Sequence, residues 1–204
     1  MLEVIPSPER ARLGFAKTVV DAFDFLVKDH GFCCVRSEMT LVRFESPVVV
    51  VNVYHGRASY EIGVEIELMN DPLAKIEPPL SLREIVEFNG AEHQTGYTKV
   101  VTFSANDADL VRKFVNKLAD LVKIYAEPVL KGDRLVFDQL RAFRSRRAAE
   151  ADREERISRI RSEADKAWQR KDYSSVINLL EKIEMHLTPA EAKKLEYARK
   201  HYRT

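Results

Sequence analysis

Apolar residues recur every three or four positions through the first thirty residues, which is the spacing of one helix face. They are Leu13, Phe15, Ala16, Val19, Val20, Phe23, Leu26 and Val27. The pattern predicts one amphipathic helix from about Pro8 to Asp29, which Gly31 ends.

From Thr40 onward the period of the hydrophobic pattern falls to two residues, the period of a half-buried strand. Strands are expected over 40–45, 48–55 and 59–68, with short turn sequences at Ser46-Pro47 and Gly56-Arg57-Ala58 between them. Connections this short predict an antiparallel meander. A loop is expected over 69–80 and a further strand over Tyr97–Phe103.

Helical spacing returns after the expected loop. Ser81 and Glu84 form a capping box that predicts a short helix ending at Asn89-Gly90. A second, longer helix is expected to follow Ser104 and to reach Tyr125, because its apolar residues form one stripe. Residues 1–130 are therefore predicted to be an α+β domain, an antiparallel sheet with helices packed on one face.

The remainder of the chain has a helical pattern throughout. A helical connector is predicted over residues 131–156, because the stretch from Arg144 to Arg156 holds no apolar residue larger than alanine and is typical of a solvated helix. A helical hairpin with a capping helix is predicted over residues 157–204. The sequence Thr188-Pro189-Ala190-Glu191 marks the start of that last helix.

The predicted hairpin has three features in order along the chain. They are the small residues Ala164 and Ala167, then Tyr173 after a tight turn, then the branched Ile177 with the leucine pair Leu179 and Leu180. This segment resembles a single tetratricopeptide repeat crossed at its inter-helix turn. It departs from the pattern at Asp172, where glycine is usual, and at Val176, where a small residue is usual. The resemblance implies packing, dimerisation or peptide recognition. Because one repeat cannot form the groove of an array, packing or dimerisation is at least as well supported as peptide recognition.

The first domain has a layout with a known counterpart. His30-Gly31-Phe32 ends a helix, the alternating segments 48–55 and 59–68 follow, and the short helix opens at Ser81-Leu82-Arg83-Glu84-Ile85. This layout resembles the small α+β immunity-type proteins found beside bacterial polymorphic toxins. The resemblance implies neutralisation of a partner toxin by binding to it.

Composition places the chain among globular proteins. It has 204 residues, 45% hydrophobic and 32% charged, with 7 Gly, 8 Pro and 2 Cys, which excludes collagen, low-complexity disorder and disulfide scaffolds. No secretory signal or membrane span is expected, since the longest aliphatic run is Val48–Val51. We therefore expect a cytoplasmic protein without a membrane partner.

The net charge of +1 conceals two opposite halves. Residues 1–130 hold 14 Lys and Arg against 19 Asp and Glu, whereas residues 131–204 hold 19 against 13. Either these opposite charges attract each other within the molecule, or each half faces a different partner.

No motif of a known enzyme class is present, whether a glycine-rich phosphate loop, a nucleophile elbow, His-Glu-x-x-His or Cys-x-x-Cys. We therefore expect a non-catalytic protein, and the sequence implies no cofactor and no metal. The adjacent Cys33 and Cys34 are expected to be unbridged, partly buried thiols. The five histidines are expected at exposed or turn positions, and a thiol nucleophile paired with His30 or His55 is the weaker alternative.

Three carboxylates alternate along the third predicted strand. Glu61, Glu65 and Glu67 share the face opposite the apolar residues, and Gly63 is expected to leave a dip between them. Such a row suits the basic surface of a protein partner. The competing interpretation is an ordinary solvated face, in which Arg43 and Arg57 neutralise the row.

Four arginines, Arg141, Arg144, Arg146 and Arg147, provide an alternative site for nucleic acid. Against it, Glu150 can pair with Arg146 one turn later, and no aromatic platform for bases lies within the stretch. The sequence thus favours a non-catalytic, intracellular protein-binding protein, in its most concrete form an immunity-type inhibitor, with a nucleic-acid-associated or regulatory protein as the alternative. Pairing of two copies through the stripe at Ile157, Ile160 and Trp168 stays open.

Overall fold

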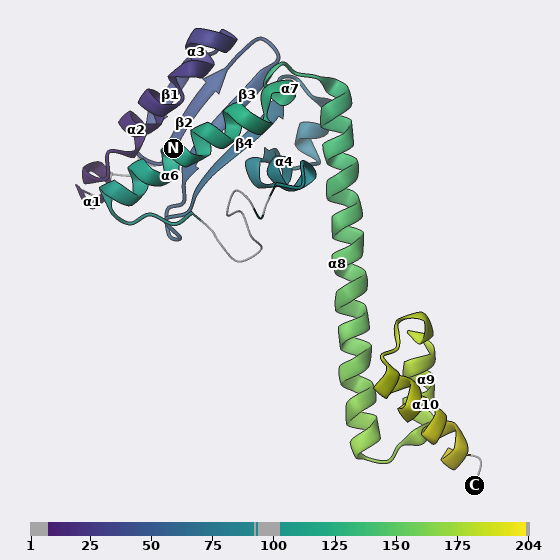
Figure 1. Cartoon of the computed structure of the whole chain (residues 1–204). Coiled ribbons are helices and arrows are strands. Elements are labelled where there is room, and N and C mark those ends of the chain that lie inside the picture. Colours follow the sequence, from purple (N-terminus) through teal and green to yellow (C-terminus); the bar gives the residue numbers. More distant parts are fainter. Residues whose placement is uncertain (1–7, 92, 94–102, 203–204) are drawn as a thin grey trace. The chain divides into compact units, whose positions relative to one another are not determined.

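The computed structural model describes residues 8–91, 93 and 103–202. The chain divides into two compact units, Met1–Phe143 and Arg144–Thr204, which we call the N-terminal unit and the C-terminal unit (Figure 1). Each unit has its own cluster of buried hydrophobic residues.

The N-terminal unit contains a five-stranded antiparallel sheet whose spatial order equals its chain order. Its strands are β1 (Cys33–Glu38), β2 (Leu41–Glu45), β3 (Val49–His55), β4 (Ile62–Leu68) and β5 (Leu80–Ser81). The predicted meander is confirmed for β2, β3 and β4. Together with the helices described below, it confirms the α+β fold class.

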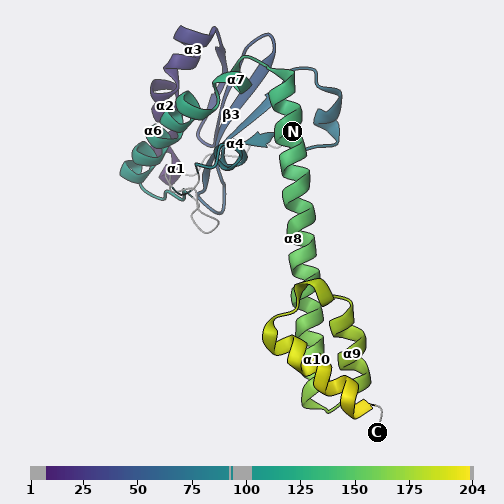
Figure 2. The ribbon, with the colours of Figure 1, turned by 45° about the vertical axis from the view of Figure 1, so that its right-hand side comes forward.

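Helices cover one face of this sheet. The helices α2 (Phe15–Ala22) and α6 (Ala108–Tyr125) lie side by side across it (Figures 1 and 2), and α4 (Leu82–Phe88) packs against β4, β5 and α6. Smaller helical segments are α1 (Pro8–Arg12), α3 (Asp24–His30), η1 (Pro72–Lys75) and α7 (Glu127–Leu130). Alternate strand residues, among them Val51, Val53, Val64 and Ile66, are buried beneath the helices, which fixes the register of each strand.

The sequence-based prediction of one N-terminal helix is wrong, because the segment forms α1, α2 and α3. Gly14 adopts a left-handed conformation (φ 64°), and Phe23 leaves helical geometry (φ −97°, ψ 13°). Gly31 ends α3 as predicted, also with a left-handed φ.

Two strands were missed and one was predicted too long. The missed strands are β1, all of whose side chains are exposed, and the two-residue β5. The third predicted strand begins at Ile62, because Tyr60 has a positive φ of 54°. The strand expected over Tyr97–Phe103 lies outside the described residues except for Phe103, whose carbonyl accepts a hydrogen bond from the Ile62 N–H at 2.7 Å.

The helix α8 (Arg134–Gln169) is 36 residues long. Its first turns belong to the N-terminal unit, where Phe137 and Leu140 are buried in the core. The remaining turns, from Arg144, belong to the C-terminal unit.

The C-terminal unit consists of those later turns of α8 with α9 (Tyr173–Glu181), η2 (Glu184–His186) and α10 (Pro189–Tyr202). The predicted start of the last helix is confirmed. The Thr188 N–H donates to Glu191 Oε2 at 2.7 Å, and the Glu191 N–H donates to Thr188 Oγ1 at 3.2 Å. In the part of the chain that the structure describes, no helix is long and apolar enough to cross a membrane.

Candidate functional site

The predicted acidic row lies on the sheet face opposite the packed helices. Across β3 and β4, Glu65 pairs with Asn52 and Glu67 pairs with Val50, while Glu61 forms a bridge with Ser104 just before β4 begins. All three glutamates are half-buried rather than fully solvated. The prediction that they share one face is therefore correct, but their side chains are less accessible than on an ordinary open sheet.

Arg43 neutralises one end of the row. Its Nε lies 2.6 Å from Glu45 Oε1, and its Nη1 lies 3.8 Å from Glu67 Oε1. The register places Val50 between these two carboxylates, and Val50 is only 1% exposed. Arg43 thus pairs with Glu67, as the competing interpretation expected, whereas no ion pair of Arg57 with the row is found among the described residues.

The dip expected at Gly63 is absent, because the Tyr54 side chain fills it. Tyr54 is the cross-strand neighbour of Gly63, and a Cβ atom at Gly63 would lie 2.7 Å from Tyr54 Cε1, which is closer than carbon atoms pack. Only glycine leaves room for this ring. Burial, with the negative charges of Glu61 and Glu65, raises the pKa of Tyr54 to about 12.

The other end of the row lacks a cation. Within the described ranges, neither Glu61 nor Glu65 forms an ion pair, and Asn52 Oδ1 is buried without a hydrogen-bond donor. Burial, together with the charge of Glu67, raises the pKa of Glu65. We call Glu61, Tyr54 and Glu65 the open acidic face. A positive charge placed there would offset the lost hydration of the half-buried carboxylates and the repulsion between neighbouring glutamates.

Sequence reasoning missed Tyr54 and Asn52 as the cross-strand neighbours of Gly63 and Glu65. Both alternate with core valines in β3, so their side was predictable. Their partners on β4 were not predictable, because the register of the two strands is set by the connection between them, which includes Tyr60 with its positive φ.

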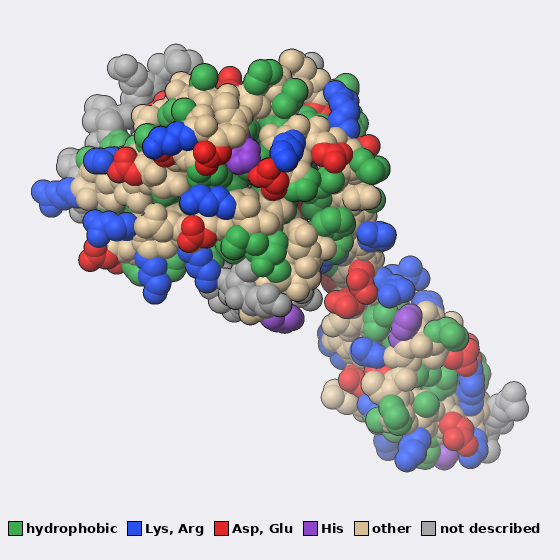
Figure 3. Space-filling model, turned by 45° about the horizontal axis from the view of Figure 1, so that its top comes forward, with side chains coloured by type: hydrophobic (Ala, Val, Ile, Leu, Met, Phe, Trp, Pro, Cys, Tyr) green, Lys and Arg blue, Asp and Glu red, His purple; other side chains and the backbone are tan. Residues whose placement is uncertain are grey.

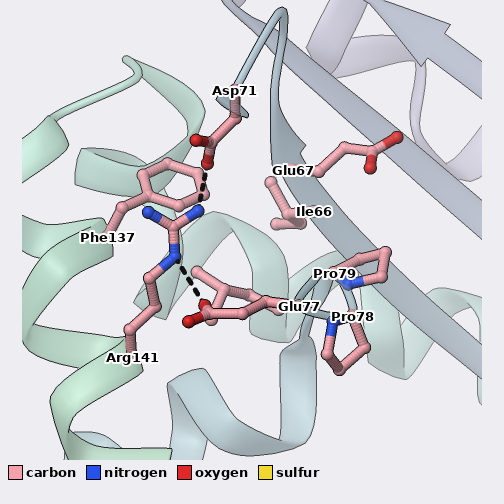
Figure 4. A pocket seen from close by; sticks show the side chains of 9 residues that line it. Ile66, Glu67, Asp71, Glu77, Pro78, Pro79, Phe137 and Arg141 are labelled. Carbon is pink, nitrogen blue, oxygen red and sulfur yellow. Dashed lines mark hydrogen bonds and ion pairs between the residues drawn. The ribbon is translucent and has the colours of Figure 1, made fainter. Parts of the chain in front are cut away.

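Arg141, the first arginine of the alternative nucleic-acid site, is engaged within the N-terminal unit. Its Nη2 pairs with Asp71 Oδ2, its Nε lies 3.1 Å from Glu77 Oε2, and its Nη1 lies 3.6 Å from Asp138 Oδ1. Figure 4 shows the guanidinium between Asp71 and Glu77, at a small pocket with room for about one water molecule. With three carboxylates around it, Arg141 is poorly placed to bind phosphate.

The other three arginines belong to the C-terminal unit. Arg146 is exposed, whereas Arg144 and Arg147 are half-buried. The ion pair predicted between Arg146 and Glu150 is not formed in the described structure. The four arginines therefore differ in exposure and in surroundings, instead of forming one free basic stripe.

The predictions for cysteine and histidine are wrong in part. Cys33 and Cys34 are free thiols, but both are exposed on β1 rather than partly buried, because β1 is an edge strand. His55 is buried, not exposed, and its Nε2 lies 2.9 Å from the Ala105 carbonyl oxygen. Among the described residues no contact joins a thiol to a histidine, and no group of three or more His, Cys, Asp or Glu is arranged to hold a metal ion.

No family model, curated protein or solved structure matches this chain. Charged side chains of both signs are interspersed with hydrophobic ones on the viewed face of each unit (Figure 3).

Proposed function

We propose that this chain is a non-catalytic, intracellular protein-binding protein of the immunity type, and that its open acidic face receives a basic side chain of the partner. The observation that supports this most is the difference within one row of glutamates. Glu67 lies near Arg43, whereas Glu61 and Glu65 have no described cation although both are half-buried.

The physical reason lies in desolvation. A half-buried carboxylate loses part of its hydration, and without an opposite charge this loss is not offset, as the raised pKa of Glu65 indicates. A partner arginine or lysine supplies the missing charge when the complex forms. Close charge pairs across protein interfaces contribute about 1.5–7 kcal/mol in double-mutant cycles.

The test compares three versions of the full chain as baits in native extract, each with and without nuclease treatment. They are the wild type, the E61Q/E65Q variant and the control E150Q/E154Q, which removes two exposed charges from α8. We expect the wild type and the control to retain the same discrete protein, and E61Q/E65Q to bind it at least about tenfold more weakly.

The immunity-type role is tested with the retained protein itself. We expect its expression to stop cell growth, co-expression of this chain to restore growth, and E61Q/E65Q to restore it less well. Equal retention by all three baits would contradict the proposal. Retention that nuclease abolishes would instead favour the nucleic-acid alternative.

A further inference from the structure

Four aromatic rings gather at one end of the C-terminal unit. Trp168 lies near the end of α8, Tyr173 begins α9, and Tyr197 and His201 lie on the last turns of α10. The Trp168 ring centroid is 5.9 Å from that of Tyr173 and 5.4 Å from that of Tyr197. Tyr173 also contacts His201, with centroids 5.9 Å apart, so the cluster joins all three helices.

The outer part of this cluster faces solvent, since Tyr197 is 44% exposed. Tyr202, the residue after His201 and the last of α10, adds a ring that is 61% exposed. The His201 ring stacks on Tyr197 with centroids 3.8 Å apart and an interplanar angle of 15°. Burial of ring surface stabilises proteins, so rings left exposed at a helix end are available to a ligand.

Basic residues adjoin the ring-bearing positions along the chain. Arg170 and Lys171 form the turn just before Tyr173, and Lys193 and Lys194 lie on α10, with Lys194 Nζ 5.9 Å from the Trp168 ring centroid. Lys194 pairs with Asp165 at 2.7 Å. For Arg170, Lys171 and Lys193 the described residues provide no ion pair.

The charge of the C-terminal unit has the same sign as this rim. It holds 16 Lys and Arg against 11 Asp and Glu. A ligand that complements both features must carry negative charges and flat faces that stack on rings. Single-stranded nucleic acid has both, because phosphates alternate with unpaired bases.

We propose that this end of the C-terminal unit, which we call the ring-and-lysine end, binds single-stranded nucleic acid. Bases stack on the exposed rings of Tyr197 and Tyr202, and phosphates contact Arg170, Lys171 and Lys193. The site is independent of the open acidic face in the N-terminal unit. It also differs from the arginines 141–147, because aromatic rings and basic residues occur together here.

The test uses the full chain and mixed-sequence single-stranded oligonucleotides, one of RNA and one of DNA. Trp168 is the only tryptophan of the chain, so its fluorescence reports directly on this cluster. We expect quenching on binding and an affinity that falls as salt rises, with a logarithmic slope of about −0.7 for each phosphate contact.

Variants separate stacking from charge. Y202A removes an exposed ring and is expected to weaken binding about fivefold or more, since one stacked base contributes about 1–3 kcal/mol. R170Q/K193Q is expected to reduce the salt slope, whereas R153Q/R156Q, which removes two exposed charges elsewhere on α8, is expected to leave it unchanged. Circular dichroism of each variant checks that its helices are intact.

Three outcomes would overturn the proposal. The first is no quenching at low salt by either oligonucleotide. The second is equal binding of heparin, a polyanion without bases, together with no effect of Y202A. The third is tighter binding of a glutamate-rich peptide than of the oligonucleotides, which would make this end a protein-binding site.

Discussion

At the scale of single residues, His55 shows how packing selects a tautomer and shifts a pKa. The Ala105 carbonyl can only accept a hydrogen bond, so His55 Nε2 carries the proton and donates it. The ring stacks on Phe15, with centroids 5.3 Å apart, and Tyr60 contacts it edge-on at 5.7 Å. Burial lowers the pKa of His55, and the charge of Arg10 lowers it further.

This environment predicts a loss of stability in mild acid. The unfolded chain binds a proton at His55 near the ordinary pKa of 6.5, whereas the folded chain binds it only at lower pH. Acidification below about pH 6.5 therefore favours unfolding. We expect the free energy of unfolding, measured with urea, to fall between about pH 7.5 and about pH 5.5.

In H55F a phenyl ring occupies the place of the imidazole but cannot be protonated, so the fall in the free energy of unfolding between the two pH values should shrink. The lost hydrogen bond lowers the stability of H55F at both pH values. The control is H186F at an exposed position. An H55F protein that loses as much stability as the wild type would show that other groups cause the effect.

Gly63 is a residue-scale requirement of the open acidic face. In G63A the new methyl group collides with Tyr54 and must displace it, and overpacking of this kind costs about 1–3 kcal/mol. We expect G63A to be destabilised by that amount in urea unfolding. With the ring removed, as in Y54A/G63A, the further cost of the methyl group should largely vanish, and a cost that persists would place the strain elsewhere.

At the scale of elements, Arg141 fastens the start of α8 to the connection between β4 and β5. Its side chain is 18% exposed and that of Asp71 only 6%. Burial opposes ionisation of Asp71, but the N–H of Leu73 and the charge of Arg141 outweigh it, and the pKa of Asp71 is lowered. The ion pair thus acts next to Phe137, which holds α8 on the core by hydrophobic contact.

Removal of this arginine should loosen the start of α8. R141M leaves the buried Asp71 carboxylate without its charged donor, and we expect the free energy of unfolding to fall by about 1.5–3 kcal/mol. R146M, an exposed position on the same helix, should change it by less than about 0.5 kcal/mol. If both variants lose the same amount, helix propensity rather than the ion pair is responsible.

The elements that could be predicted are those whose side chains carry a clear period. Val49–His55 and Ile62–Leu68 alternate because one face of each strand is buried. The segment Cys33–Glu38 forms β1 with every side chain exposed, so burial left no pattern in its sequence. Leu80–Ser81 is too short for any period and pairs only through Glu65 and Ile66.

The candidate site was predictable to the same extent. Alternation placed Glu61, Glu65 and Glu67 on one face, but which of them meets Arg43 depends on strand register and side-chain reach. The dip expected at Gly63 could not be tested from the sequence for the same reason, since Tyr54, which fills it, comes from the neighbouring strand. The ring-and-lysine end was missed because its rings come from three separate helices.

At the scale of the whole molecule, the chain has two cores that share no residue. The buried residues of one lie between Leu13 and Leu140, and those of the other between Ile160 and Ala198. Every residue from 141 to 159 is exposed or half-buried. The units also differ in charge, with 17 basic and 21 acidic residues in the first unit and 16 basic and 11 acidic residues in the second. Salt should therefore change the affinity of each unit for its partner to a different extent.

Separate cores predict separate unfolding transitions. The C-terminal unit has about 60 residues and buries few large side chains, so it should be the less stable of the two. Trp168 reports on this unit alone, while the NMR amide signals of the strands report on the other. We expect the fluorescence transition at a lower urea concentration than the transition of the strand amides, and a fragment of residues 1–143 to retain the midpoint that the strand amides have in the full chain. If the two probes coincide in the full chain and the fragment fails to fold, the units form one cooperative structure, and the two proposed binding sites could not be assigned to independent parts.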